Sequence, residues 1–195
     1  MEDPRLGILI SPNDNDEFVG VENGAGRGNA PESGAFSVLT TDNYYSQRTA
    51  PIVIASFAEL KFIEAEAALR ANPAQPARAY QAYIDGITAH MDKVGVDPVD
   101  RDAYLNDPAV AVGAGALTID DVMREKYVAL FLHPETWVDA RRYDYAYEDM
   151  TIPANLNQDL NGQFIRRLVY PDSETQRNGE NVPEVSLGDR LFWDQ

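Results

Sequence analysis

The chain has 195 residues, with 16 Lys and Arg against 32 Asp and Glu, a formal net charge of −16 at pH 7, and no cysteine. Net acidity disfavours nucleic acid as a partner, and the lack of cysteine excludes disulfides, thiolate metal sites and thiol nucleophiles. The sequence contains no run of about 18 apolar residues and no basic start followed by an apolar run, so neither a membrane span nor a signal peptide is predicted.

Residues 1–55 are predicted to form loops and short strands. Gly, Asn, Asp, Ser and Pro cluster there, and apolar runs are brief, at Leu6–Ile10 and Phe36–Leu39. The segment Gly24–Gly28 lacks the flanking strand and helix that a phosphate-binding loop requires, so we expect a flexible turn.

Residues 56–143 are predicted to be the helical part of the chain, beginning with a helix over Ser56–Asn72. Ser56 and Glu59 have the spacing of a capping box, and Pro73 follows the end of the helix. The apolar residues that recur at helical spacing are Leu60, Ile63 and Ala67.

A second helix is predicted from Pro76 to Val94, with Gly95 as its C-cap. Its apolar stripe consists of Tyr80, Ile84, Ile87, Met91 and Val94. Two antiparallel helices with a combined length of roughly 34–40 residues match a tetratricopeptide-like hairpin, although no second copy is found by period. The hairpin needs neighbours to cover its apolar faces.

A third helix is predicted from the N-cap Thr118 to His133, with Asp121 completing the cap. Its apolar face consists of Ile119, Val122, Met123, Tyr127, Leu130 and Phe131. Proline is tolerated in the first turn of a helix, so the chain is expected to restart at Pro134 as a short helix over Glu135–Tyr143, set at an angle to the one before. Residues 144–195 are predicted to be irregular coil packed on the helices, with strand character only at Gln163–Tyr170.

Two clusters of charged residues have helical spacing. Glu64 and Glu66 point roughly 200° apart on a helix, so they cannot form one acid/base pair; we expect one exposed carboxylate and one helix–helix hydrogen bond. In the other cluster, Trp137 and Arg141 are spaced for a cation–π contact, while Asp139 and Arg142 are spaced for an ion pair. This second cluster is expected to be structural, with anion binding as the alternative.

Neither a metal nor a cofactor is predicted. His90 and His133 are far apart in sequence and are expected to be surface or cap residues rather than ligands. The segment Asn157–Gly162 resembles the start of a calcium loop, but Leu168 stands where the closing Glu is required, so a turn is expected.

Ligand-binding residues are predicted on the loop before the first helix, at Asn43, Tyr44, Tyr45 and Arg48. Sugars offer apolar faces and hydroxyl edges, so aromatic rings beside amide and guanidinium groups are suitable partners. The alternative is that one tyrosine packs into the core and the other is incidental.

Three strings in fixed order carry a resemblance to a known family: FAELKFIEAEAALR at Phe57–Arg70, ETWVDARR at Glu135–Arg142 and RLVYP at Arg167–Pro171. A further string, DPRL at Asp3–Leu6, lies upstream of the first. With this order and spacing, nearly the whole chain resembles the C-terminal half of a SusD/RagB-type nutrient-binding outer-membrane lipoprotein.

The resemblance implies a mainly α fold: a tetratricopeptide-like helical hairpin scaffold with long irregular loops and minor β structure, forming the C-terminal part of a single domain over residues 1–195. In this family the ETWVDARR string looks like a fold signature that holds the short helix onto the tail. Such proteins are attached to the outer membrane through an acylated cysteine after the signal peptide. Because this chain has neither feature, we expect a fragment or trimmed form that lacks the N-terminal half.

The function implied is binding rather than catalysis: capture of a glycan, or less often a peptide, on the outward face of the cell outer membrane for a TonB-dependent SusC-like transporter. The leading alternative is a helical-repeat adaptor that binds another protein, and a glycoside hydrolase comes third. Long loops around few helix pairs favour the first interpretation over the adaptor. No two carboxylates are marked out at the separation that glycoside hydrolysis requires.

Overall fold

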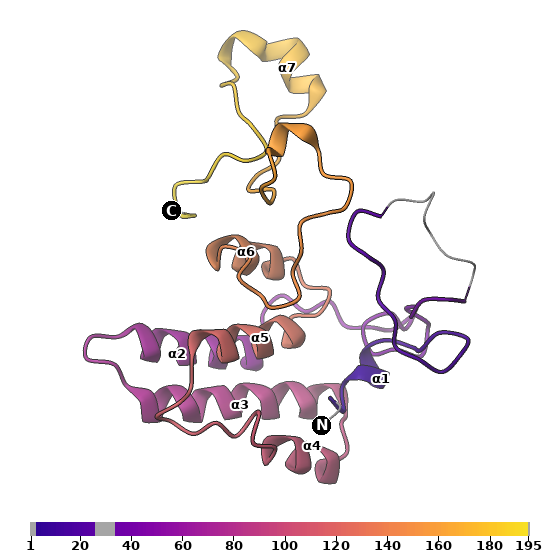
Figure 1. Ribbon diagram of the computed structural model, residues 1–195, viewed down its shortest axis with the longest axis vertical. Helices are drawn as coiled ribbons and strands as arrows, with labels where there is room; N and C mark the ends of the chain where they lie inside the picture. The colour runs from indigo at the N-terminus through magenta and orange to yellow at the C-terminus, as the bar shows by residue number, and fades with distance from the viewer. Residues whose placement is uncertain (1–2, 26–33, 195) are drawn as a thin grey trace. The chain divides into compact units, whose positions relative to one another are not determined.

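A computed structural model of the protein describes residues 3–25 and 34–194 (Figure 1). The chain divides into two compact units, one formed by Met1–Gly20 with Ser33–Thr136 and the other by Val21–Glu32 with Trp137–Gln195. Helices predominate, and the β structure within the described residues is a single antiparallel bridge between Ser11 and Val38. The prediction of a mainly α fold with minor β structure is therefore confirmed.

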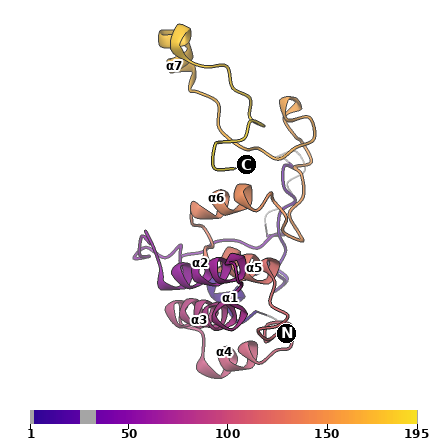
Figure 2. The same cartoon turned by 90° about the vertical axis from the view of Figure 1, so that its left-hand side faces the viewer.

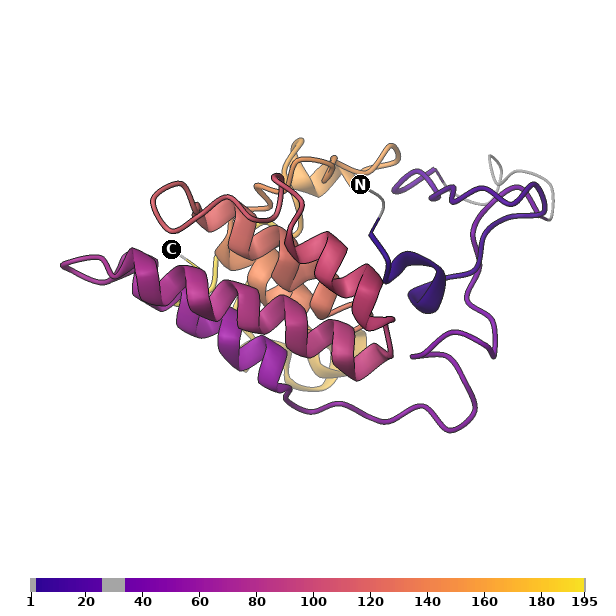
Figure 3. The same ribbon diagram turned by 90° about the horizontal axis from the view of Figure 1, so that it is seen from below.

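The first unit is built around an antiparallel pair of helices. In chain order its helices are α1 (Leu6–Leu9), α2 (Phe57–Arg70), α3 (Pro76–Val94), α4 (Pro98–Leu105) and α5 (Ile119–Ala129). Helices α2 and α3 lie side by side, α5 packs against both of them, and α4 packs against α3, as Figures 2 and 3 show from two further directions. The predicted hairpin of two helices is present, and its relation to tetratricopeptide repeats stays a prediction.

The contact between α2 and α3 depends on small residues. The buried residues of α2 are Ala58, Phe62, Ala65, Glu66 and Ala68. Gly86 of α3 faces the Phe62 ring so closely that an added Cβ would come within 3.0 Å of it. The predicted stripe through Leu60 and Ile63 is wrong, since these side chains are 58% and 47% exposed. The alanines let the two helices approach with Phe62 between them, and Leu60 and Ile63 remain on the outer face.

Of the two roles expected for Glu64 and Glu66, the helix–helix hydrogen bond is present and the exposed carboxylate is not. Glu64 makes the helix–helix contact, because it accepts a hydrogen bond of 2.9 Å from Arg78 of α3 and one of 3.1 Å from Lys61. Glu66 is not exposed; it is buried and accepts a hydrogen bond of 2.8 Å from Arg70 within α2. The two carboxylates serve separate ion pairs, as their spacing requires.

The helix starts follow the predicted caps in part. Ser56 caps α2 by accepting a hydrogen bond of 3.1 Å from Glu59 N–H, but the reciprocal bond of the predicted capping box is not formed. Thr118 and Asp121 form a capping box at α5, and Gly95 ends α3 in the left-handed region at φ 84°. Helix α5 ends at Ala129 rather than at His133, and Leu132 adopts a positive φ of 60°. A helix cannot continue through that backbone conformation. The prediction that Tyr127 belongs to the apolar face is wrong, since its side chain is exposed.

The N-terminal segment of the first unit is anchored in the core. Residues Leu6–Leu9 form a helical turn, not the short strand or loop predicted for this apolar run. Arg5 is fully buried and forms ion pairs of 2.6 Å with Asp3 and 2.7 Å with Glu125 of α5. Sequence analysis missed α4, whose caps Asp97 and Pro98 were available as a signal.

The second unit contains most of α6 (Glu135–Arg142), followed by η2 (Gln158–Leu160), α7 (Asp172–Asn178) and η3 (Gly179–Asn181). Helix α6 was predicted one residue longer. The segment Gln163–Tyr170, which has strand character in the sequence, is irregular, as predicted for this tail. The N–H groups of Arg166 and Arg167 both bond to the carbonyl of Leu187, and no ladder forms. At the calcium-like segment, Asn157 caps η2 by accepting a hydrogen bond of 3.0 Å from Asp159 N–H.

Candidate functional site

A cavity of about 220 Å³ lies in the first unit, beside the turn that carries the predicted binding residues. Its walls come from that turn, the loop before α2, the last turn of α3, and the end of α5 with the residues that follow. The lining residues are Tyr45, Pro51, Ile52, Val53, Ser56, Lys93, Ala129, Leu130, Phe131, Leu132, His133 and Pro134. The walls are largely apolar and aromatic, with a few polar groups among them, as is usual for small-molecule sites.

The turn at residues 43–48 presents its side chains in different directions. Asn43 is 2% exposed, and its Oδ1 accepts hydrogen bonds from Thr40 N–H at 2.8 Å and from Ser11 Oγ at 3.2 Å. These bonds hold the turn in place. The amide oxygen of Asn43 is therefore already used within the protein.

Of the four predicted binding residues, Tyr45 alone is a lining residue of the cavity. Tyr44 packs edge-to-face against Tyr45, with ring centroids 4.9 Å apart, and also lies against the core. Arg48 is exposed at the end of the turn. The structure thus brings the two tyrosines together, and the binding role of all four residues stays a prediction.

Lys93, in the last turn of α3, is the cation of the cavity. Its Nζ donates a hydrogen bond of 2.9 Å to the Tyr45 hydroxyl and lies 5.0 Å from the centroid of the Tyr45 ring. Burial lowers the pKa of Lys93 and raises the pKa of Tyr45, because the charged form of each group loses hydration. The Lys93 side chain thus lies directly beside the Tyr45 ring and hydroxyl at the cavity.

His90 lies behind Tyr45, and its predicted surface position is wrong. The side chain is fully buried, and its Nε2 is 3.2 Å from the Tyr45 hydroxyl. Burial, followed by the positive charges of Arg5 and Lys93, lowers the pKa of His90 from 6.5 to about 3. The imidazole is therefore neutral at pH 7 and supports Tyr45 from inside the core.

His133 is a cap residue, as predicted, and it also shapes the cavity wall. Its Nδ1 accepts a hydrogen bond of 3.2 Å from Glu135 N–H at the start of α6. That bond assigns the proton to Nε2, which donates to the carbonyl of Val53 at 3.1 Å. The ring thus holds the loop before α2 against the end of α5.

The cavity combines ring faces with a donor. Tyr45 and Phe131 have ring centroids 6.4 Å apart, and Lys93 supplies an ammonium beside them. Such a site can bind a small ligand that has both an apolar face and oxygen acceptors. Sequence analysis did not assign Lys93, Phe131 or His133 to the binding site, because nothing in their spacing relates them to the turn at residues 43–48.

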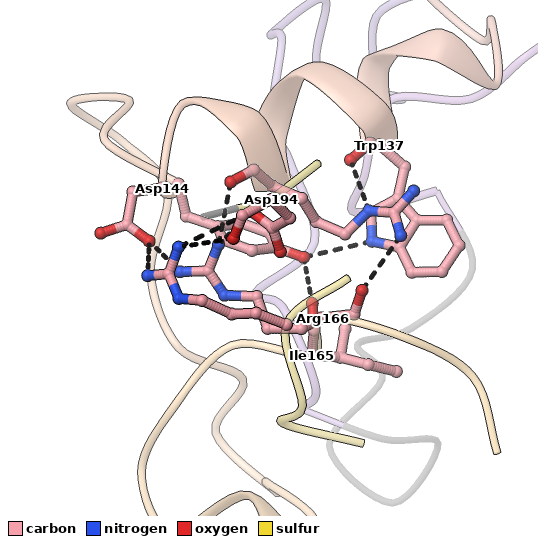
Figure 4. A network of polar contacts seen from close by, with 8 residues as sticks. Trp137, Asp144, Ile165, Arg166 and Asp194 are labelled. Carbon is pink, nitrogen blue, oxygen red and sulfur yellow. Dashed lines mark hydrogen bonds and ion pairs between the residues drawn. The ribbon is translucent and has the colours of Figure 1, made fainter. Parts of the chain in front are cut away.

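The aromatic–arginine cluster predicted from ETWVDARR is present in the second unit (Figure 4). The Arg141 guanidinium lies 3.9 Å from the centroid of the Trp137 ring and 4.7 Å from that of Trp193. Arg141 also donates to the carbonyl of Arg166 at 3.0 Å, and Arg166 donates to the carbonyl of Arg141 at 2.8 Å. These reciprocal bonds join α6 to the segment before the RLVYP string.

The remaining groups of this cluster are also paired. Tyr145 accepts a hydrogen bond of 3.1 Å from Trp137 Nε1 and donates to the carbonyl of Ile165. Arg166 forms ion pairs with Asp144 and, at 3.2 Å, with Asp194. The predicted ion pair between Asp139 and Arg142 is present at 2.9 Å. With its donors directed at carbonyls and carboxylates of the same unit, the cluster packs α6 against this segment.

Neither metal-binding nor membrane-spanning features occur within the described parts of the chain. Over residues 3–25 and 34–194, no group of three or more His, Cys, Asp or Glu side chains is placed to hold a metal ion. The helices in these ranges are also too short or too polar to cross a membrane.

Comparison with known proteins identifies the family. A SusD-like family model, described as starch-binding and associating with the outer membrane, matches residues 1–171. The chain belongs to this SusD-like family. The resemblance drawn from the DPRL, FAELKFIEAEAALR, ETWVDARR and RLVYP strings is thereby confirmed.

A solved structure of a SusD-like protein, Bacteroidetes AC2a, shares the fold, with a TM-score of 0.58 and 26% sequence identity. The similarity covers 77% of this chain and 32% of that protein, so the chain spans about a third of the relative's length. No curated protein sequence matches the chain. Proteins of the SusD-like family are binding proteins rather than enzymes, and their description associates them with starch and the outer membrane.

Proposed function

We propose that this chain is part of a cell-surface protein that binds a glycan and passes it to a TonB-dependent SusC-like transporter. The observation that carries the proposal is the SusD-like match over residues 1–171. In this proposal, residues 1–195 form the C-terminal part of a single SusD-like domain. The complete protein is held on the outer membrane by a lipid anchor and faces outward.

The binding residues that we propose are Asn43, Tyr44, Tyr45 and Arg48, with distinct tasks. Tyr45 supplies a ring face at the cavity, Tyr44 supports that ring edge-to-face, and the exposed Arg48 extends the polar surface beside it. Asn43 acts through the turn, because its amide oxygen accepts bonds from Ser11 and Thr40.

The proposal is tested by calorimetry of the purified protein with neutral maltooligosaccharides and by a glycan array. In a small site, only the interaction free energy that exceeds the costs of desolvation and ordering contributes to affinity. We therefore expect dissociation constants from millimolar to micromolar, which correspond to binding free energies of about −4 to −8 kcal/mol. Tyr45→Ala is expected to weaken binding more than Tyr44→Ala. Phe192→Ala is the matched control, since it removes an exposed ring of the second unit.

Two outcomes would contradict the proposal. If both tyrosine variants bind a parent ligand unchanged, the turn at residues 43–48 is not part of the site, although the family assignment stands. If the array shows no glycan bound and the chain hydrolyses chromogenic glycosides, the function is catalytic and the binding proposal fails.

A further inference from the structure

Lys93 differs from Lys61, which lies on the outer surface of the α2–α3 pair and forms ion pairs there. Lys61 forms ion pairs of 3.1 Å with Glu64 and 3.2 Å with Asp85. Lys93 instead donates one hydrogen bond to the Tyr45 hydroxyl, and within the described residues no carboxylate forms an ion pair with it. An ammonium group has three N–H donors, so its hydrogen-bonding capacity is far from exhausted.

The surroundings of Lys93 make this arrangement unusual for so acidic a chain. The protein has a net charge of −16, so carboxylates are abundant, yet none of those described pairs with the ammonium at the cavity. Burial lowers the pKa of Lys93, because the charged form loses hydration. A half-buried charge without a counter-charge loses hydration that none of the described carboxylates replaces, and an anionic ligand group would supply the missing partner.

Two further features of the cavity fit an anion attached to a hydroxylated ring. Ser56 is a lining residue and caps α2, so the N-terminal end of a 14-residue helix, with its positive partial charge, lies at the cavity. On the other side, Ala129 and Leu130 mark the C-terminal end of α5. The carbonyl of Val128 at this end already accepts Phe131 N–H, and a carbonyl oxygen has a second lone pair that can accept a ligand hydroxyl group.

We propose that the cavity binds an acidic sugar, with the carboxylate of a uronic acid unit paired to Lys93 and the sugar ring against Tyr45. A volume of about 220 Å³ is below the range of about 300–1,000 Å³ for drug-sized ligands, so the cavity takes a single sugar unit. This inference rests on the proposed glycan-binding function and names the class of glycan.

The inference is tested by calorimetry of the purified protein with a galacturonic acid trimer and a galactose trimer, which differ in charge but not in length. Hydrogen bonds to charged groups contribute enough to change affinity by about tenfold or more, so the acidic trimer is expected to bind at least about tenfold more tightly. Lys93→Met should abolish this difference, and Lys93→Arg should retain most of it. Lys61→Met removes an equal charge from the outer surface and should leave both affinities unchanged.

A second measurement does not depend on variants. The chain has only three lysines, so the ammonium of Lys93 can be followed by NMR of the protein carrying ¹³C-methylated lysines. The galacturonic acid trimer should raise the pKa of Lys93, since a paired carboxylate stabilises the charged form, whereas the galactose trimer should not.

The outcomes separate this inference from the proposed function. If the protein binds both trimers equally and Lys93→Met changes neither affinity, the acidic-sugar inference is overturned and glycan binding stands. If the protein binds neither these trimers nor any glycan on the array, both are overturned. A pKa of Lys93 that does not move at saturation with the acidic trimer also overturns the inference, even if that trimer binds.

Discussion

Arg5 and Glu125 lie 120 positions apart in sequence, and Arg5 Nη2 is 2.7 Å from Glu125 Oε2 inside the first unit. Both side chains are almost fully buried. Tyr104 donates a hydrogen bond of 2.8 Å to the other oxygen of Glu125, and Asp3 pairs with the same guanidinium. Through this pair the DPRL string is attached to α5, which gives a physical reason for that string to accompany the fold.

Glu125→Gln is expected to destabilise the protein by about 3–5 kcal/mol, because it leaves the buried Arg5 without its partner in α5. Urea unfolding followed by circular dichroism measures the change. Glu148→Gln is the control, since Glu148 is exposed and should change stability little. The double variant Arg5→Met/Glu125→Leu should recover part of the loss, because it removes both charges together. If Glu125→Gln were as stable as Glu148→Gln, the ion pair between Arg5 and Glu125 would contribute nothing to stability.

Gly86→Ala is expected to destabilise the protein, although alanine is ordinarily about 1 kcal/mol more favourable than glycine inside a helix. The new methyl group would come within 3.0 Å of the Phe62 ring, which is fully buried in a close-packed core. Overpacking of this kind lowers stability by about 1–3 kcal/mol. Thermal unfolding provides the measurement, with Gly115→Ala as the control because its Cβ would meet no atom within 4 Å.

A second variant separates overpacking from other effects at Gly86. Phe62→Leu shortens the side chain opposite, so the added methyl group should be tolerated better in the double variant than in the parent. A melting temperature for Gly86→Ala at or above that of the parent would contradict the close approach of α2 and α3.

The sequence predicts the position of the main helices well and the choice of their buried faces less well. The residues at the helix ends act through local hydrogen bonds and backbone angles, so each signal is contained within a few residues. These residues are Ser56, Pro76, Thr118 and Gly95. The buried face of α2 depends instead on how closely α3 can approach. Alanines at that contact leave Leu60 outside, and a hydrophobic pattern alone cannot indicate this.

The candidate site was predictable only in part, for a similar reason. Tyr45 stands out in the sequence because aromatic and polar residues adjoin it on a loop. Lys93 and His133 reach the same cavity from α3 and from the residues after α5, through contacts between distant segments. The positive φ of Leu132, which ends the predicted helix early, has no local signal such as glycine or asparagine.

Trp137→Ala is expected to destabilise the second unit by about 2 kcal/mol, through loss of apolar burial and of the Arg141 contact. The change is smaller than for a fully buried tryptophan, because this side chain is only half-buried. Thermal unfolding and amide exchange at Tyr145, whose N–H bonds to the carbonyl of Ala140, measure the effect. Phe192→Ala removes an exposed ring and is the control. If Trp137→Ala left the melting temperature unchanged but abolished glycan binding, Trp137 would have to be assigned to the binding site.

The stability of the protein is expected to fall as the pH drops from about 6.5 toward 3, because of His90. Its pKa is about 3 in the folded protein and ordinarily 6.5, so below pH 6.5 the unfolded chain takes up a proton that the folded chain does not. Protonation inside the core would place a positive charge near Arg5 and Lys93, and Nδ1 is buried without a hydrogen-bond partner among the described residues.

The size of this loss of stability follows from the difference between the two pKa values of His90. Between pH 7.5 and pH 5.0 the contribution of His90 should decrease by about 2 kcal/mol, since each pH unit below 6.5 corresponds to about 1.4 kcal/mol. Urea unfolding of the parent and of His90→Gln at both pH values isolates this group, because the carboxylates titrate in both proteins. His133→Gln should keep the pH dependence of the parent. If His90→Gln loses as much stability on acidification as the parent, His90 is not held neutral by the fold.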